Sequence, residues 1–355
     1  MPPRSAVVKI GTSSVTDADG AVDHAAMVSL AGDVVALRAE GWSVVVVTSG
    51  AITAGWGEVG RGAPRPADSV SLQAVSAVGQ PLVMRAWRDA FAEHGVSVGQ
   101  VLLAPLDFSH RGQYLHARQT LAALEAFGVV AIVNENDAVA GEEFRFGDND
   151  RIAALVANLV AASHLVLLTD TEGLLTADPR LDASATLIEE VSSIDAGLLD
   201  VAGRSRSGVG SGGMASKLSA ARMATWSGIT TVIAPARADA ALRHALHATP
   251  GFGTTFHPRP ERLSARKAWI AFAVSSKGVV RVNEGARDAI ENHGRSLLRV
   301  GVVSYEGEFY EGDAVEIAGP DGAIIAKGLS RADVDTVDEV DIVVHRDDLV
   351  LLRKA

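Results

Sequence analysis

Residues 43–49, SVVVVTS, form an almost uninterrupted apolar run that ends in two hydroxyl side chains. A run that is apolar at nearly every position is typical of a parallel strand buried on both faces of its sheet. Five similar runs are AVVKI at 6–10, VGQVLLA at 98–104, VVAIVN at 129–134, LVLLT at 165–169 and TTVIA at 230–234. Together these runs predict a buried parallel sheet.

Helical patterns lie between these runs. Met27, Leu30, Val34 and Leu37 recur at spacings of three and four, which predicts one face of a helix that ends at Gly41. The same type of pattern occurs at 71–94, 113–127, 151–162 and 214–227. Strand and helix therefore alternate up to residue 234, and this alternation predicts an α/β fold with helices on both faces of the sheet.

The pattern changes after Gly251. The stretch GFGTTFHPRPERL at 251–263 contains two prolines and two glycines without clear periodicity, which indicates a linker. Short strands are expected beyond it, in 269–274, 278–282, 301–313, 314–330 and 341–352, with a hairpin turn at Gly319-Pro320-Asp321-Gly322. We therefore expect two domains, residues 1–255 and a small, mostly β domain at 267–355, joined by a linker at 256–266.

Composition restricts the class of protein. The net charge of −11 argues against a surface that binds nucleic acid or anionic lipid as a whole. The absence of cysteine excludes disulfides, thiolate metal sites and cysteine nucleophiles, and it is consistent with a reducing cytoplasm. The N-terminus lacks the features of a signal peptide, and polar residues interrupt the most apolar stretch, 152–168. A soluble, cytoplasmic protein without a membrane segment is expected.

Polar clusters follow the predicted strands or begin the predicted helices. The carboxyl ends of parallel strands meet at one edge of a sheet, where ligands bind, so these clusters are expected to converge. The clusters that contain charged or hydroxyl side chains are Lys9–Gly11, Thr48–Ala51, Asn134–Asp137, Gly147–Asp150, Thr169-Asp170 and Gly208–Lys217. Their convergence predicts a binding site that draws on all six.

The last of these clusters is a glycine-rich turn that leads into a helix. Backbone N–H groups in such a turn can approach a phosphate, and Lys217 could neutralise charge on a transferred group. Two G-x-G-x-x-G matches, which begin at Gly55 and Gly208, lack the strand–turn–helix context of a dinucleotide site. A Walker P-loop is excluded because the chain contains no Gly-Lys dipeptide.

In this order, the motifs resemble those of the glutamate 5-kinases of the amino-acid kinase family. The resemblance covers nearly the whole chain and rests on VVKIGTS, VVTSGAI, VVAIVNENDAV, FGDNDRIAALVA, LLTDTEGLLTADPR and GSGGMASK. Residues from about 267 to 344 look like a PUA domain. Ser211 and Ser216 stand where relatives often have threonine, a change that keeps the hydroxyl group.

The resemblance implies an αβα sandwich that phosphorylates the side-chain carboxylate of L-glutamate with ATP, which is the first step of proline synthesis. It also implies a requirement for Mg²⁺, formation of a homo-oligomer (a dimer or a tetramer) and feedback inhibition by proline. Because Mg²⁺ favours few protein ligands, we expect the phosphates and water to hold it, and no protein metal ligand is assigned.

The resemblance also assigns residues to roles. Lys9 and Lys217 would supply positive charge on two sides of the transferred phosphoryl group, and Asp150 would hold both ammonium groups in place. A carboxylate acceptor is already ionised at pH 7, so no strong general base is required. Ser49, Asp137 and Asn149 match the glutamate-binding positions, with Asp137 accepting hydrogen bonds from the α-amino group. The nucleotide site would comprise Lys9, Thr169, Asp170, Ser211, Gly212, Gly213, Met214, Ala215, Ser216 and Lys217.

Two alternatives remain open at this point. Another amino-acid kinase could act on aspartate, N-acetylglutamate or a nucleotide, although NENDAV and FGDND favour glutamate. The PUA-like tail could instead indicate an RNA-binding protein. Residues 261–300 carry eight basic and four acidic side chains, but residues 301–355 carry five basic and thirteen acidic ones. RNA affinity usually requires a sustained basic face, so RNA binding is disfavoured as the main role.

Overall fold

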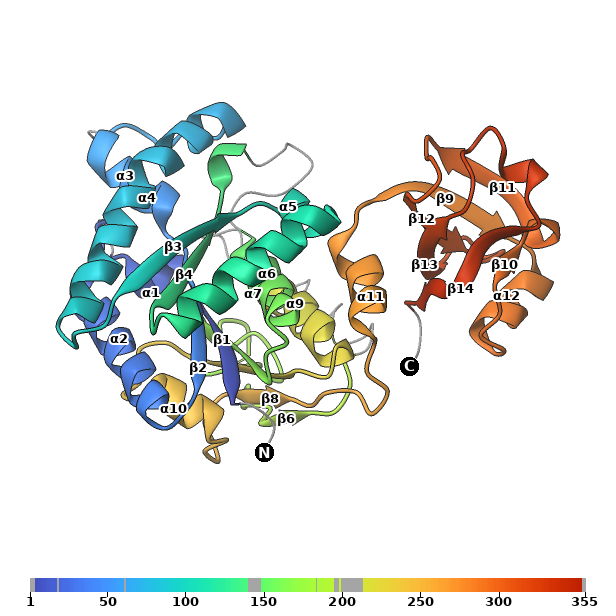
Figure 1. Ribbon diagram of the computed structural model, residues 1–355. Helices are drawn as coiled ribbons and strands as arrows, with labels where there is room; N and C mark the ends of the chain where they lie inside the picture. The colour runs from blue at the N-terminus through green and yellow to red at the C-terminus, as the bar shows by residue number, and fades with distance from the viewer. Residues whose placement is uncertain are drawn as a thin grey trace. The chain divides into compact units, whose positions relative to one another are not determined.

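The computed structural model describes residues 4–17, 19–60, 62–139, 148–182, 184–194, 198 and 213–352. The chain divides into two compact units, Met1–Arg262 and Leu263–Ala355 (Figure 1). The boundary lies inside the predicted linker.

The first unit is built on an eight-stranded sheet. Its order is β3-β4-β2-β1-β5-β7-β8-β6, and neighbours pair in parallel except β7 and β8. Strand β1 therefore lies between β2 and β5, near the middle of the sheet. The strands are β1 (Ser5–Ile10), β2 (Ser43–Val47), β3 (Val98–Leu103), β4 (Val130–Glu135), β5 (His164–Thr169), β6 (Glu190–Val191), β7 (Thr230–Pro235) and β8 (Thr254–Phe256).

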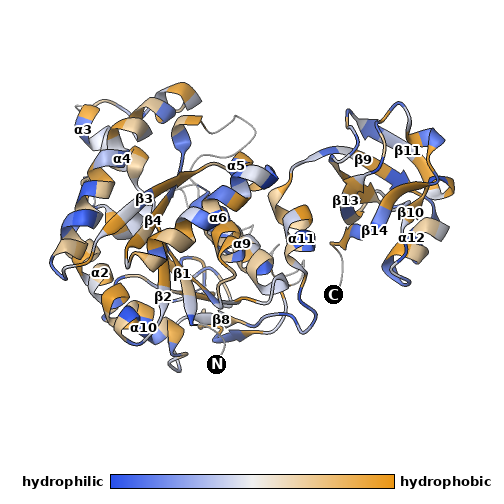
Figure 2. Ribbon diagram, viewed as in Figure 1, coloured by the Kyte–Doolittle hydropathy of each residue, from blue (hydrophilic) through white to orange (hydrophobic). Residues whose placement is uncertain are grey.

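Helices cover both faces of this sheet (Figure 1). On one face α2, α4 and α10 share an apolar core with the strands, and on the other α7 packs against β1 and α9. Figure 2 shows that the helices carry both hydrophilic and hydrophobic residues, as expected when one side of a helix faces a core. The helices are α1 (Thr12–Val15), α2 (His24–Ala39), α3 (Ala51–Val59), α4 (Ser69–Ala92), α5 (Pro105–Ser109), α6 (Arg111–Ala126), α7 (Asn149–Leu159), α9 (Met214–Trp226) and α10 (Ala241–Leu246). A 3₁₀ turn, η1 (Asp137–Val139), follows β4.

Strand alternation assigns Lys9 to the face that α7 and α9 cover. Ala6, Val8 and Ile10 belong to the core beneath α2, α4 and α10. Side chains at alternate positions of a strand point to opposite faces, so Val7 and Lys9 point to the other side. The sequence of β1 thereby places a lysine where the N-termini of α7 and α9 can reach it.

Most predicted elements of this unit are confirmed. All six predicted strands form, and Met27, Leu30, Val34 and Leu37 are buried on one face of α2. One detail differs. Strand β3 is only partly buried, because it lies at one end of the strand order. The match that begins at Gly55 lies in α3 and at its C-cap, Gly60, so its backbone is helical and does not form a phosphate loop.

The predicted linker at 251–263 is wrong in one part. Thr254–Phe256 forms β8, which pairs with β6 and β7, and the Phe256 side chain is fully buried. A three-residue strand within a stretch rich in Gly and Pro gives too short a pattern to detect. The core of the first unit therefore extends further along the chain than its periodic segments.

The second unit contains a six-stranded sheet in the order β10-β14-β13-β12-β9-β11. The predicted hairpin at Gly319–Gly322 is confirmed, because it joins β12 to β13. The strand expected at 269–274 is wrong: Trp269–Ala273 forms a π-helical turn, η2, directly after α11. The elements are α11 (Ala265–Ala268), β9 (Ser276–Val282), α12 (Glu284–Glu291), β10 (Leu297–Leu298), η3 (Arg299–Gly301), β11 (Val302–Gly307), β12 (Ala314–Ala318), β13 (Ile324–Ser330), η4 (Val337–Glu339) and β14 (Ile342–Leu351).

Within the described part of the chain, no helix is both long enough and apolar enough to cross a membrane.

Candidate active site

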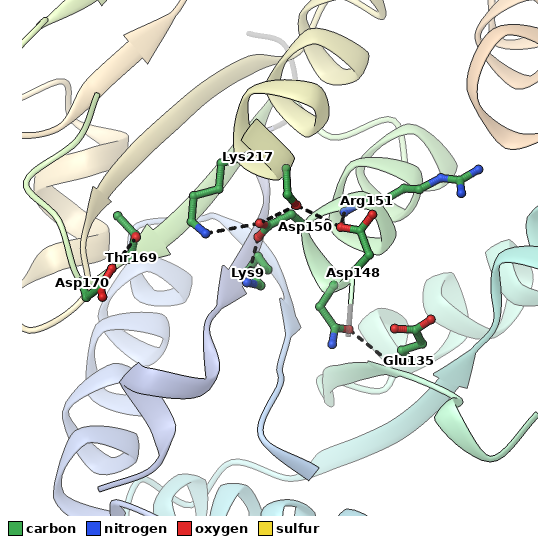
Figure 3. Close-up of polar contacts among 10 residues, drawn as sticks. Lys9, Glu135, Asp148, Asp150, Arg151, Thr169, Asp170 and Lys217 are labelled. Atoms are coloured by element: carbon green, nitrogen blue, oxygen red, sulfur yellow. Dashed lines mark hydrogen bonds and ion pairs between the residues drawn. The ribbon is translucent and has the colours of Figure 1, made fainter. Parts of the chain in front are cut away.

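Two lysines and one aspartate meet at the carboxyl end of the central strands (Figure 3). Lys9 Nζ lies 2.8 Å from Asp150 Oδ1, and Lys217 Nζ lies 3.3 Å from Asp150 Oδ2. The side chains come from the end of β1 and the first turns of α7 and α9, and all three are at most 5% exposed. We call these three residues the lysine cluster.

Charge pairing determines the ionisation of this cluster. Burial alone would raise the pKa of Asp150, but the ammonium groups of Lys9 and Lys217 outweigh it and lower the pKa to about 2. Burial lowers the pKa of Lys217, and the Asp150 carboxylate opposes that shift. Asp150 is therefore an anion at any physiological pH. The cluster has two cations for one anion, and this excess suits the binding of a phosphate.

Ser216 links the lysine cluster to the N-terminus of α7. Its Oγ lies 3.0 Å from both Asp148 Oδ1 and Asp150 Oδ2, and its single hydrogen can be donated to only one of them at a time. Asp148 caps α7 by accepting a hydrogen bond from the backbone N–H of Arg151. A hydroxyl at position 216 therefore connects the start of α9 to the start of α7.

The remaining predicted nucleotide-site residues that the structure describes lie around the start of α9 and the end of β5. Gly213 precedes the first turn of α9, which contains Met214 and Ala215. Thr169 Oγ1 donates a hydrogen bond to Asp170 Oδ1, and the charge of Asp170 acts on Lys217. Ser211 and Gly212, as well as Gly147 and Gly208, lie outside the described residues.

A second buried aspartate lies after β4. The Asp137 carboxylate is 4% exposed, and Ser76 Oγ of α4 donates a 2.6 Å hydrogen bond to its Oδ2. Its Oδ1 is buried and has no hydrogen-bond partner among the described residues. Burial raises the pKa of Asp137, and the Ser76 hydroxyl only partly opposes the shift. This carboxylate is therefore held by one neutral donor and retains one open acceptor.

Ser49 and Asn149 are buried at the same edge of the sheet. Ser49 follows β2, and Gly50 then turns the chain into α3 with a φ of +97°, a conformation that favours glycine. Asn149 is the first residue of α7, and its Oδ1 accepts a 3.2 Å hydrogen bond from the backbone N–H of Glu135. That bond connects the end of β4 to the helix that carries Asp150.

Sequence reasoning missed two side chains of α4. Besides Ser76, Gln80 donates a hydrogen bond to the backbone carbonyl of Glu135 and accepts one from Asn134 Nδ2, each at 3.1 Å. Both residues lie in a helical pattern in which a single serine or glutamine gives no functional signal. Their spacing of four residues, which places them on one helix face, is the only hint the sequence offers.

The comparisons with known proteins agree with this arrangement. The model of the "Amino acid kinase family" matches residues 4–235, and that of the "PUA domain" matches residues 278–346. The glutamate 5-kinase of Rhodococcus jostii is 45% identical over 98% of this chain and 97% of its own length. That of Pelobacter propionicus is 40% identical, with the same two coverages.

A solved structure shares the fold of the first unit. The UMP kinase of Ureaplasma parvum matches 72% of this chain and 100% of its own, with a TM-score of 0.50 and 16% identity. At that identity the likeness shows the fold alone. The family model and the curated relatives show more: the chain belongs to the amino acid kinase family and, within it, to the glutamate 5-kinases that carry a C-terminal PUA domain.

Proposed function

We propose that this chain transfers the γ-phosphoryl group of ATP to the side-chain carboxylate of L-glutamate, giving L-glutamyl 5-phosphate for proline synthesis. One observation carries the proposal: the buried lysine cluster lies at the same carboxyl end of the sheet as buried Asp137, of which only one carboxylate oxygen has a hydrogen-bond partner among the described residues. The first suits a phosphate and the second suits an ammonium group. Membership of the glutamate 5-kinases supports this choice of donor and acceptor.

Lys9 and Lys217 act on the transferred group. Phosphoryl transfer requires alignment and positive charge around the oxygens of the γ-phosphate more than it requires proton transfer. Asp150 bonds to both ammonium groups and fixes their positions before ATP arrives. Preorganised charge of this kind stabilises the transition state without reorganisation during the reaction.

Asp137 acts on the acceptor. Its open Oδ1 would accept a hydrogen bond from the α-ammonium of glutamate, and Ser49 and Asn149 would contact the carboxylates of the substrate. The reacting carboxylate of glutamate is ionised at pH 7 and can attack phosphorus directly. No side chain is therefore required as a strong base.

The nucleotide would lie over the start of α9. The proposal assigns Thr169, Asp170 and residues 211–217 to the nucleotide, and the N-terminus of α9 favours the phosphates. Mg²⁺ would enter with ATP. The described residues contain no group of three or more His, Asp or Glu that could hold a metal, and both Asp150 oxygens already face ammonium groups. Phosphate and water oxygens would be its main ligands.

Three further features belong to the proposal. Proline, which carries the same α-carboxylate and a charged amine, would inhibit by competing for the Asp137 end of the site. The chain would assemble into a homo-oligomer, a dimer or a tetramer. The cytoplasmic location expected from its composition stays a prediction.

A substrate panel tests the proposed reaction. Purified protein is supplied with ATP and Mg²⁺ and with glutamate, aspartate, N-acetylglutamate or UMP, and acyl phosphate is trapped as the hydroxamate while ADP is measured in parallel. We expect turnover with glutamate and its inhibition by proline. Turnover with another acceptor, and none with glutamate, would overturn the assignment.

A further inference from the structure

Helix α4 contributes none of the residues that the sequence assigns to the site, yet it contacts the end of β4 at two points. Ser76 binds Asp137, and Gln80, one turn later on the same helix face, binds Glu135 and Asn134. The Ser76 and Asp137 atoms involved are buried and come from positions 61 residues apart. The contact is therefore a tertiary one that the fold has to bring about.

The same helix is locked against α3. A Cβ atom at Gly79 would lie 1.7 Å from the carbonyl oxygen of Ala51, and one at Gly55 would lie 2.0 Å from that of Val75. Only glycine allows two helix backbones to approach so closely. Since α3 begins directly after Ser49 and Gly50, α4 is fixed to the turn that carries Ser49 as well as to Asp137.

We propose that Ser76 is a positioning residue for the acceptor amino acid, holding one oxygen of Asp137 so that the other faces the substrate's α-ammonium group. The inference rests on the proposed function. Its geometric basis is the unequal treatment of the two oxygens: Oδ2 accepts a 2.6 Å hydrogen bond, while Oδ1 is buried without a partner among the described residues. A carboxylate held at one oxygen cannot rotate without breaking that bond.

The chemical type of the donor matters as much as its position. A lysine or arginine at position 76 would neutralise Asp137 and would compete with the substrate's ammonium group. A hydroxyl group supplies a hydrogen bond but no charge, so the negative charge remains available to the ligand. Ser76 thereby favours an acceptor that carries an ammonium group on its α-carbon.

The test compares Ser76→Ala and Ser76→Thr in the full chain, using kinetics with glutamate and ATP. We expect Ser76→Ala to raise the KM for glutamate about tenfold, because a hydrogen bond to a charged group is lost. The kcat and the KM for ATP should change less than about twofold, as expected when uniform binding of one substrate is lost. Ser76→Thr keeps the hydroxyl and should recover most of the loss.

Glutarate separates positioning from general packing, because it is glutamate without the amino group. As a substrate or as a competitive inhibitor, it should bind to Ser76→Ala about as well as to the unmodified chain. Ser71→Ala is the matched control: it removes a hydroxyl from the first turn of the same helix, where Ser71 contacts Asp68. That variant should leave both kinetic constants for glutamate unchanged.

Three results would overturn the inference: an unchanged KM for glutamate in Ser76→Ala, an equal rise in the KM for ATP, or an equal loss of glutarate binding. Circular dichroism reports folding. If Ser76→Ala does not fold, Ser76→Cys, a weaker donor of similar volume, carries the same test. Failure of the proposed function looks different, because the unmodified chain would then not phosphorylate glutamate at all.

Discussion

The pKa values of the two buried aspartates of the candidate site are shifted in opposite directions. Asp150 lies between two ammonium groups that lower its pKa to about 2, whereas burial raises the pKa of Asp137, whose one described partner is a neutral hydroxyl. Two ammonium groups of the protein pair with the Asp150 carboxylate, whereas Asp137 Oδ1 has no hydrogen-bond partner among the described residues. A charge that is already paired serves to hold other groups in place, and a charge that is not paired serves to bind.

The largest effect is expected from the lysine cluster. Lys9→Ala and Lys217→Ala each remove a charge that the proposed mechanism directs at the transition state, so kcat should fall by roughly 10²-fold or more. Steady-state kinetics on folded protein measure this, and Lys277→Ala, an exposed lysine of the second unit, is the control. Near-normal kcat in both variants would remove the catalytic role of the cluster.

Removing the charge of each aspartate should affect stability unequally. Asp150→Asn leaves two buried ammonium groups without their anion, which should cost about 3 kcal/mol of unfolding free energy. Asp137→Asn removes a carboxylate whose burial is unfavourable, so its cost should be below about 1 kcal/mol. Urea unfolding of both variants at pH 7 measures the two values. Equal losses of unfolding free energy in the two variants would show that the lysines do not stabilise the Asp150 charge more than the surroundings of Asp137 stabilise its own.

Binding of the acceptor should depend on Asp137. Asp137→Asn is expected to raise the KM for glutamate about tenfold or more, since an ion pair is replaced by a neutral contact. The KM for ATP should stay close to its original value. Equal losses for the two substrates would mean that Asp137 does not belong to the glutamate end of the site.

The pH profile should separate the two carboxylates. Because the pKa of Asp137 is raised, its negative charge is lost first as the pH falls, and the KM for glutamate should rise as the pH is lowered from 7 towards 4. Asp150 stays ionised over that range because its pKa is about 2, so kcat should change little. In Asp137→Asn the rise in KM should disappear. A rise that persists in this variant would assign the pH effect to another group.

The smallest effect on catalysis is expected from removal of the second unit. Each proposed site residue precedes residue 218, and the first compact unit ends at Arg262. A chain that ends after Arg262 should form glutamyl phosphate at a rate within about threefold of the full chain, as measured by hydroxamate formation. A chain that ends after Gly253 lacks β8 and should not fold. A folded but inactive chain ending at Arg262 would show that the second unit contributes to the site.

The sequence predicted that Lys9, Asp150 and Lys217 lie near one another because polar residues at strand ends and at the starts of helices meet at one edge of a parallel sheet. The more specific expectation, that Asp150 holds both ammonium groups, came from the resemblance to the glutamate 5-kinases. The apolar runs of six strands were long enough to recognise. Their order in the sheet, and hence which clusters become neighbours, came from the structure.

Other features left no readable pattern. Ser76 is one polar residue on a helix, and nothing in its local sequence points to a carboxylate 61 residues away. Strand β8 is three residues long, and Gly and Pro surround it. The apolar stretch Trp269–Ala273 fits a short strand and a helical turn equally well, and tertiary packing selected the turn.

Strand β8 also has a consequence for the order of folding during synthesis. β6, at Glu190–Val191, pairs only with β8 among the described strands, and β8 is made more than sixty residues later. The β8–β6 end of the strand order therefore stays incomplete until Phe256 has left the ribosome, long after the central strands can pair. Since domains generally fold as units during synthesis, completion of the first unit should immediately precede the appearance of the second.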